Sequence, residues 1–352
     1  MKRSPIVYFL FLFSGITALI YEVVWTRMLT LAFGHTVFSV SIVLASFMAG
    51  LGLGSYFFGH AINHMGGKKI QLDDSNLSGD FSEDLETPST LLIYGWIEIA
   101  LFLLCLIVSL ILFKFSVIYS WFSFFIPEST VVQNIFKSFL AFILMVVPAS
   151  LMGATLPIIT KYYITDNIRL NSRLGLLYGI NTIGAAVGCL LAGFFLIANF
   201  GVLQTVLTAS LLNLFIGISA IRIYQESLEN SQIFRFPRFT MSKISWKGDQ
   251  WLWVFVSFIC GFTALAYEIL WTRLLVFSTS STVYSFSMML GVFLIGIALG
   301  SFLVAAVLRS NLDLRTVLIV LQVSIGFYVI GSLYNMELLL SAPWNGYNLQ
   351  KP

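Results

Sequence analysis

The chain has 352 residues, of which 58% are hydrophobic and only 10% are charged, and its mean hydropathy is +0.92. A soluble domain normally carries about 25% charged residues, so this composition excludes a soluble globular protein and predicts an integral membrane protein. The formal net charge of +3 indicates little by itself, and no nucleic-acid partner is expected.

Nine apolar runs are long enough to cross a lipid bilayer as helices, because a spanning helix needs about 20 residues. The predicted fold is therefore an all-α integral membrane protein with about nine transmembrane helices. In chain order the runs are Ile6–Leu29, Thr36–Ile62, Thr90–Phe113, Ile135–Tyr162, Arg173–Phe200, Val202–Ile223, Gln250–Leu275, Thr282–Leu308 and Arg315–Leu339. The first run is predicted to be a retained span and not a cleaved signal peptide, since it recurs inside the chain.

The loops divide these runs into unequal parts. Residues 1–224 form a first bundle of six spans, with an acidic insertion at 71–88 between the second and third. This insertion is predicted to be solvated and not a calcium loop, because Leu85 stands where a bidentate Glu is required. Residues 225–249 are a polar, basic linker, 250–340 are a partial second bundle of three spans, and 341–352 are a tail.

The loop charges predict the orientation. With the N-terminus inside, the outer side carries only Arg27, Lys114, Lys137, Arg273 and Lys351 of the 19 Lys and Arg residues. Because Lys and Arg accumulate in cytoplasmic loops, the N-terminus is expected in the cytoplasm and the protein in the cell (inner or plasma) membrane.

An internal repeat organises the chain. Residues Ser14–Ser55 recur without a gap as Cys260–Ser301, and both copies contain the pattern Y-E-x-x-W-T-R. The identical pairs include Gly15 with Gly261, Glu22 with Glu268, Arg27 with Arg273, Gly54 with Gly300, and Ser55 with Ser301. Many apolar sequences make a spanning helix equally well, so this identity indicates a duplicated fold with parallel repeats and a paired role for these residues.

Glu22 and Glu268 are the first candidates for chemistry, since each lies well inside a predicted span. An ionised carboxylate there is costly unless it is paired, hydrated or protonated. One hypothesis is a structural latch between the repeats, in which Glu22 pairs with Arg273 and Glu268 with Arg27. The other is a substrate or proton site, and the sequence leaves both open.

Glu98 lies in the third span without a cation nearby in sequence. It is either a protonated carboxyl bonded to a neighbour, or a site for a cation or a proton. Gln322 stands at the equivalent place of the second half, which predicts that this position needs a polar group but not always a charge.

The fourth span contains Pro148, Gly153 and Pro157, which are candidate helix breaks of the kind that line transporter sites; a packing kink is the alternative. In the fifth span, Asn181 lies among glycines at helix-packing spacing, which favours close packing over binding. The three cysteines Cys105, Cys189 and Cys260 lie in apolar runs without disulfide or metal spacing. No cofactor and no metal are expected.

Several stretches carry a family resemblance. The loop GHAINHMGGKK at 59–69 looks like the conserved cytoplasmic loop of the major facilitator superfamily, with Asn63 and His64 where that family prefers Asp and Arg. The two Y-E-x-x-W-T-R helices with their trailing FMAGLGLGS and FLIGIALGS, LMGATLP at 151–157, and the glycine-rich fifth span resemble the membrane region of spermidine-synthase-like multi-spanning proteins, which fuse a facilitator to a spermidine synthase.

This resemblance implies a major-facilitator-like six-helix first half and a soluble aminopropyltransferase-like domain after the helices. Nothing in the chain matches that domain, so no catalytic residue is carried over, and whether the protein is an enzyme stays open. Two functions remain. One is a transporter-like module that binds or moves a small, polyamine-like cationic metabolite. The other is a membrane anchor for a cytosolic aminopropyltransferase-like domain or subunit, missing here or encoded separately.

Overall fold

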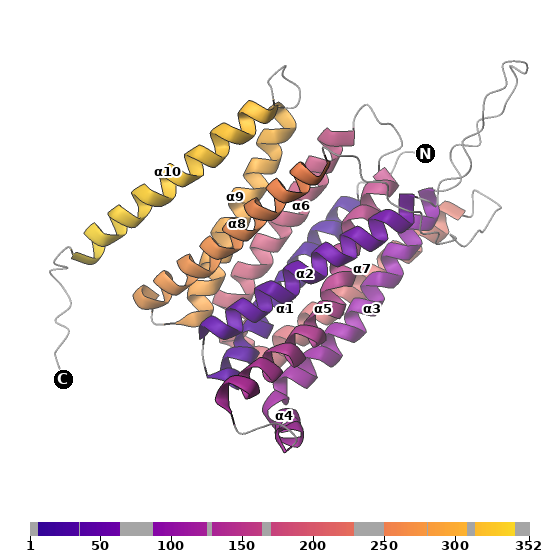
Figure 1. Cartoon of the computed structure of the whole chain (residues 1–352). Coiled ribbons are helices and arrows are strands. Elements are labelled where there is room, and N and C mark those ends of the chain that lie inside the picture. Colours follow the sequence, from indigo (N-terminus) through magenta and orange to yellow (C-terminus); the bar gives the residue numbers. More distant parts are fainter. Residues whose placement is uncertain are drawn as a thin grey trace, which may run out of the picture. The chain divides into compact units, whose positions relative to one another are not determined.

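The computed structural model describes residues 6–34, 36–63, 87–124, 129–163, 170–228, 250–279, 281–307 and 314–341, and these residues are almost entirely helical (Figure 1). The all-α prediction is therefore confirmed for the described chain. The helices are α1 Ile6–Phe33, α2 Thr36–Asn63, α3 Thr87–Phe113, α4 Phe115–Ser123, α5 Thr130–Tyr163, α6 Leu170–Leu191, a π-helical turn at Ala192–Leu196, α7 Ile197–Leu228, α8 Gln250–Thr279, α9 Thr282–Val307 and α10 Leu314–Ser341.

The chain forms two compact units, Met1–Leu303 and Val304–Pro352. Helices α1 to α8 and nearly all of α9 belong to the first, and α10 belongs to the second. The predicted linker and the acidic insertion lie outside the described residues except at their ends, as does the predicted tail after Ser341.

Eight helical segments within the described residues are long and apolar enough to cross a membrane, so this is a multi-pass membrane protein. One of them, Leu174–Glu226, has 53 residues, more than twice the length that a bilayer requires. Gly201 interrupts its helical geometry with φ 78° and ψ 174°, a backbone conformation that glycine adopts without a steric penalty. The predicted boundary between the fifth and sixth spans falls at this residue.

Helix α1 lies at the centre of the first unit, in contact with α2, α3, α6 and α7. Its contacts with α3 include three hydrogen bonds, from the Tyr94 hydroxyl to the Leu10 carbonyl (3.3 Å), from Ser14 Oγ to Glu98 Oε1 (2.6 Å) and from Trp25 Nε1 to Ser109 Oγ (2.8 Å). Each bond joins residues 84 positions apart. A constant separation requires the two helices to run parallel and in register, as two spans that begin on the same side would.

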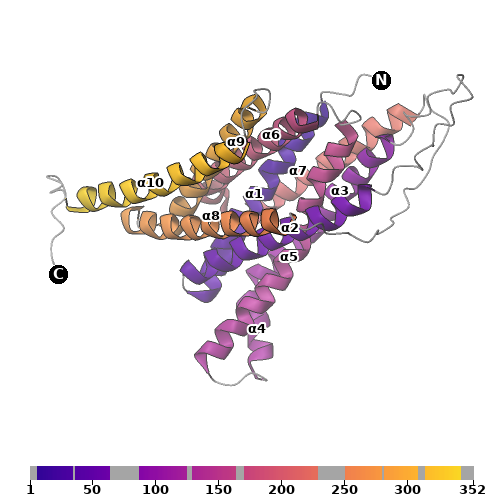
Figure 2. The same cartoon turned by 45° about the horizontal axis from the view of Figure 1, so that its top comes forward.

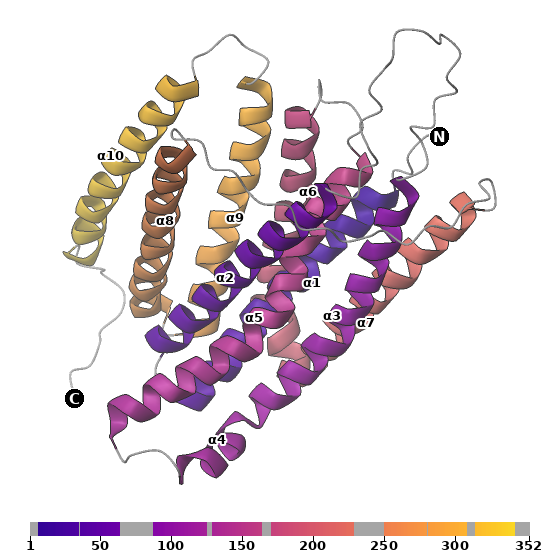
Figure 3. The ribbon, with the colours of Figure 1, turned by 45° about the vertical axis from the view of Figure 1, so that its right-hand side comes forward.

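Helix α2 runs alongside α5, and α3 runs alongside α7 (Figure 3). The short helix α4, which the sequence did not predict, follows α3 and precedes α5 (Figure 2). The α2–α5 contact depends on small residues. A Cβ added at Gly50 or Gly54 would collide with Ala149 or Ser150, and one added at Gly153 would collide with the backbone of Leu51. Such close approach drives helix association in lipid, where burial of apolar surface cannot.

Of the two alternatives that the sequence leaves open for the fourth span, a helix break and a packing kink, the structure does not contain the break. Helix α5 continues through Pro148, Gly153 and Pro157 without interruption. Pro157 has no N–H group, so the Gly153 carbonyl one turn before it lacks its helical donor. Ser55 of α2 replaces that donor, since its Oγ bonds the Gly153 carbonyl at 2.8 Å. A neighbouring serine thus satisfies the group that the proline frees, which lets the helix persist.

Candidate functional site

Three carboxyl side chains are buried among the described residues. The exposed fractions are 2% for Glu22 on α1, 0% for Glu98 on α3 and 1% for Glu268 on α8. Each has one carboxyl oxygen with no hydrogen-bond partner in the described part of the chain. Because buried polar groups are nearly always hydrogen-bonded, three such oxygens in one protein need an explanation.

Glu22 and Glu268 belong to one polar cluster. Glu22 on α1 and Glu268 on α8 lie within electrostatic range of each other and of the Cys189 thiol on α6. That thiol donates to the Ser287 carbonyl on α9 at 3.4 Å, and the Ser287 hydroxyl oxygen is buried without a partner in the described residues. Four helices therefore contribute to this cluster two carboxyls, a thiol and a hydroxyl.

The arrangement of these groups favours a positively charged occupant. Two carboxylates that share a buried space repel each other unless a cation or a proton lies between them. The unsatisfied oxygens of Glu22, Glu268 and Ser287 offer oxygen acceptors to such an occupant. Within the described residues, no group of three or more His, Cys, Asp or Glu side chains is placed to hold a metal ion.

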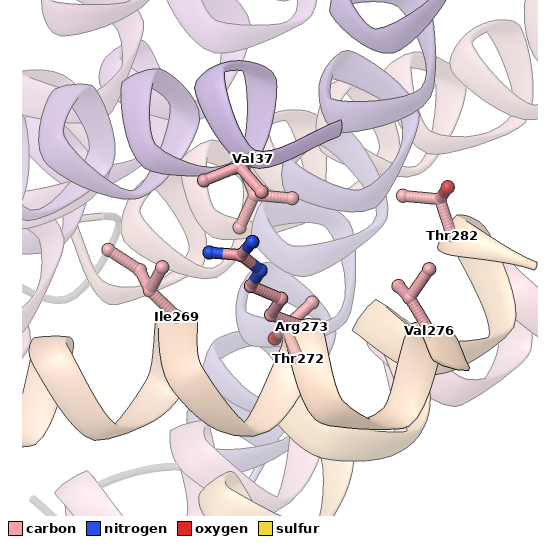
Figure 4. Close-up of a pocket in the computed structure, with 7 residues that line it drawn as sticks. Val37, Ile269, Thr272, Arg273, Val276 and Thr282 are labelled. Atoms are coloured by element: carbon pink, nitrogen blue, oxygen red, sulfur yellow. The ribbon is translucent and has the colours of Figure 1, made fainter. Parts of the chain in front are cut away.

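The predicted cross-repeat ion pairs do not form in the described structure. The side chain of Arg273 is exposed, and that of Arg27 is half-buried. Arg273 instead lines a pocket of about 230 Å³ together with Val37, Thr272 and Thr282, and its guanidinium extends from α8 toward Val37 (Figure 4). The arginine lies five residues beyond the glutamate, more than one helical turn toward the end of the helix, so the two side chains point to different surroundings.

The threonine of the repeated motif has a local role in both copies. Thr26 Oγ1 bonds the Glu22 carbonyl at 2.8 Å, and Thr272 Oγ1 bonds the Glu268 carbonyl at 2.9 Å. Both bonds run to the backbone one turn earlier in the same helix. The two threonines therefore donate to the backbone of their own helix and not to the glutamate side chains.

Glu98 forms a second, separate polar site. It accepts the hydrogen bond from Ser14 on α1, while its Oε2 has no partner in the described residues. Ser14 precedes Glu22 by eight residues, which is about 12 Å along the axis of α1. Tyr94 lies one turn earlier on α3 and donates its hydroxyl to the Leu10 carbonyl of α1. Glu98 therefore has one oxygen bonded to a neighbour and one without a partner in the described residues, so both sequence hypotheses stay open.

The remaining candidates lie elsewhere. Asn181 is half-buried on α6, where its carbonyl leaves no space for a Cβ at Gly15, so it contributes to helix packing. Gln322 lies on α10, in the second unit. The sequence reasoning missed Ser14 and Ser287 as site residues and took Cys189 for a packing residue. Ser14 opens the repeat, and that was the one signal available for it.

Comparison with known proteins adds no relative to this description. No family model, no curated protein and no solved structure matches the chain.

Proposed function

We propose that this protein is a transporter-like membrane module that binds a small cation between Glu22 and Glu268. One observation carries the proposal: the two duplicated helices each bury a carboxyl oxygen without a partner among the described residues, and the two carboxyls lie within electrostatic range of each other. A buried carboxyl inside a membrane protein is costly, and it faces a substrate or ion pathway when no side chain compensates it.

The cation that we propose has more than one ammonium group, as a polyamine-like metabolite has. Glu98 supplies a further carboxyl about 12 Å along α1 from the Glu22–Glu268 pair. Two acceptor sites at that separation suit an elongated cation better than a single metal ion. Ser14 and Ser287 add hydroxyl oxygens beside the two sites.

The topology that we propose has nine spans, because Gly201 divides the 53-residue segment into two. Nine spans from a cytoplasmic N-terminus agree with the loop charges. Within this proposal the major-facilitator-like repeat and the resemblance to spermidine-synthase-like membrane proteins keep their place as hypotheses, with localisation in the cell membrane.

The test is binding of radiolabelled spermidine to the purified chain in lipid nanodiscs. Glu22→Gln and Glu268→Gln each remove one carboxylate while keeping the shape of the side chain, and each should weaken binding strongly. Glu226→Gln is the matched control, since Glu226 is an exposed carboxyl at the end of α7. Competition with putrescine, Na⁺ and K⁺ measures which cation is preferred.

Equal spermidine binding by both site variants and by the control would refute the cation site. The alternative function would then stand, a membrane anchor for an aminopropyltransferase-like domain or subunit. That alternative is favoured by the exposure of α8, of which only 6% of the most apolar window is buried. Surface of this kind on a membrane helix is available to lipid or to a partner.

A further inference from the structure

The repeated glycines have different surroundings in the two halves of the chain. In the first half, Gly50 and Gly54 of α2 pack so closely on α5 that neither can accept a Cβ without a clash. Their counterparts on α9 are Gly296 and Gly300. A Cβ added at either of these would meet no heavy atom of the described first unit within 4 Å. The same residues that dock a helix in one copy are thus uncovered in the other.

The serine that follows the second glycine also has a different partner in the two copies of the repeat. Ser55 of α2 reaches across to the Gly153 carbonyl that Pro157 frees on α5. Its counterpart Ser301 turns back and bonds the Ile297 carbonyl of its own helix at 2.8 Å. That carbonyl sits one turn earlier in a regular α-helix, where a backbone N–H already bonds it, so Ser301 satisfies no orphan group. The Ser301 hydroxyl can therefore turn from this carbonyl to one on a neighbouring helix, as the Ser55 hydroxyl does, without leaving an orphan group behind.

The contacts of Gly296, Gly300 and Ser301 within the described part of the first unit do not require glycines or a serine at these places. Glycine weakens a helix interior, and two glycines one turn apart are useful where another backbone must approach closely. Gly261 of α8 agrees with this, since it is open, whereas its counterpart Gly15 packs on the Asn181 backbone of α6.

We propose that the face of α9 formed by Gly296, Gly300 and Ser301 docks a membrane-spanning helix whose packing surface matches that of α5. Two features define this occupant. It carries small residues at the contact, as α5 does at Ala149 and Ser150, and it carries a Gly-x-x-x-Pro segment whose freed carbonyl accepts the Ser301 hydroxyl. The first half of the chain provides the template for both features, and the inference does not depend on the cation site.

The experiment uses the full chain in nanodiscs and a synthetic peptide of the α5 sequence, residues 130–163, as the probe. Binding is measured from the fluorescence of a label on the peptide. The double variant Gly296→Leu/Gly300→Leu should weaken binding by about tenfold or more, because leucines prevent close approach. Both sites are open, so the fold of the free chain tolerates the change. Gly52→Leu is the matched control, since Gly52 is an open glycine of α2 outside this face.

A second arm tests the polar contact. Ser301→Ala should weaken binding of the native peptide several-fold, and should have no effect on a peptide carrying Pro157→Ala, in which the proline no longer frees the carbonyl. A third arm tests position. Gly300→Cys in the chain should form a disulfide with Ser150→Cys in the peptide, in a Cys260→Ala background, because the other two native cysteines are buried.

Three results would overturn the proposal. One is peptide binding that the double leucine variant leaves unchanged. Another is absence of peptide binding, with this face exposed only to lipid. The last is crosslinking of Gly300→Cys to a second copy of the chain or to another segment of the same chain in place of the peptide.

Discussion

The bond from Ser55 to the Gly153 carbonyl gives a prediction about stability. Ser55→Ala removes the donor, and Pro157 prevents the helix from replacing it, so a buried carbonyl stays unpaired. An unsatisfied buried group costs about 1–3 kcal/mol. Hydrogen bonds between membrane helices average about 0.6 kcal/mol and reach about 1.7, since the unfolded state in the membrane also finds partners. We therefore expect Ser55→Ala to lower the free energy of unfolding by about 1–1.5 kcal/mol.

The assay is reversible unfolding in mixed micelles with increasing SDS, followed by tryptophan fluorescence. Ser301→Ala is the matched control and should change the free energy by less than about 0.5 kcal/mol, because it removes a bond to a carbonyl that is already satisfied. Pro157→Ala restores the backbone donor, so the loss caused by Ser55→Ala should shrink in that background. An equal loss with and without Pro157, or an equal loss for both serines, would contradict the reasoning.

Three further predictions concern the seam between α1 and α3 and the topology. Trp25→Phe removes the donor to Ser109 and should cost about 1 kcal/mol of unfolding free energy in the same SDS assay. Glu98→Gln keeps an acceptor for Ser14 and should retain folded yield by size-exclusion chromatography while weakening spermidine binding, whereas Glu98→Leu should lose yield; equal yields would show that the Ser14 bond is dispensable. A cysteine placed at Ser78 should react with an impermeant maleimide only after cells are permeabilised, and labelling of intact cells would reverse the topology.

The helices were predictable from the sequence because spanning helices leave a simple signal, about 20 apolar residues between polar loops. The predicted fifth span ends at Phe200 and the predicted sixth begins at Val202, and the residue between them, Gly201, is non-helical in the structure. A turn between two spans interrupts the helical backbone in this way. The continuity of α5 was not predictable. It depends on Ser55, which lies 98 residues from the carbonyl that it bonds, and no local pattern around Pro157 contains that information.

The candidate site was predictable in its carboxyls and not in their partners. A glutamate inside an apolar run is conspicuous, and Glu22, Glu98 and Glu268 are all buried. The pairing with Arg27 and Arg273 was inferred from pseudo-symmetry, and the structure does not contain it. Whether two side chains meet depends on helix rotation and tilt, and packing with neighbouring helices determines both.

The internal repeat places similar sequences in two environments. Comparing the contacts of matching residues therefore shows which residues act within their own helix and which act on a neighbouring helix. The two threonines of the motif make the same bond in both copies, so their role is local to the helix. The serines and glycines have different contacts in the two copies, so their role is to pack against another helix.

The two glutamates differ from both groups, because they are buried in both copies although the helices around them differ in exposure. Helix α8 is buried over 6% of its most apolar window against 61% for α1, yet Glu268 is as inaccessible as Glu22. In each glutamate one carboxyl oxygen is buried without a hydrogen-bond partner among the described residues, which is the arrangement that the proposed cation site requires.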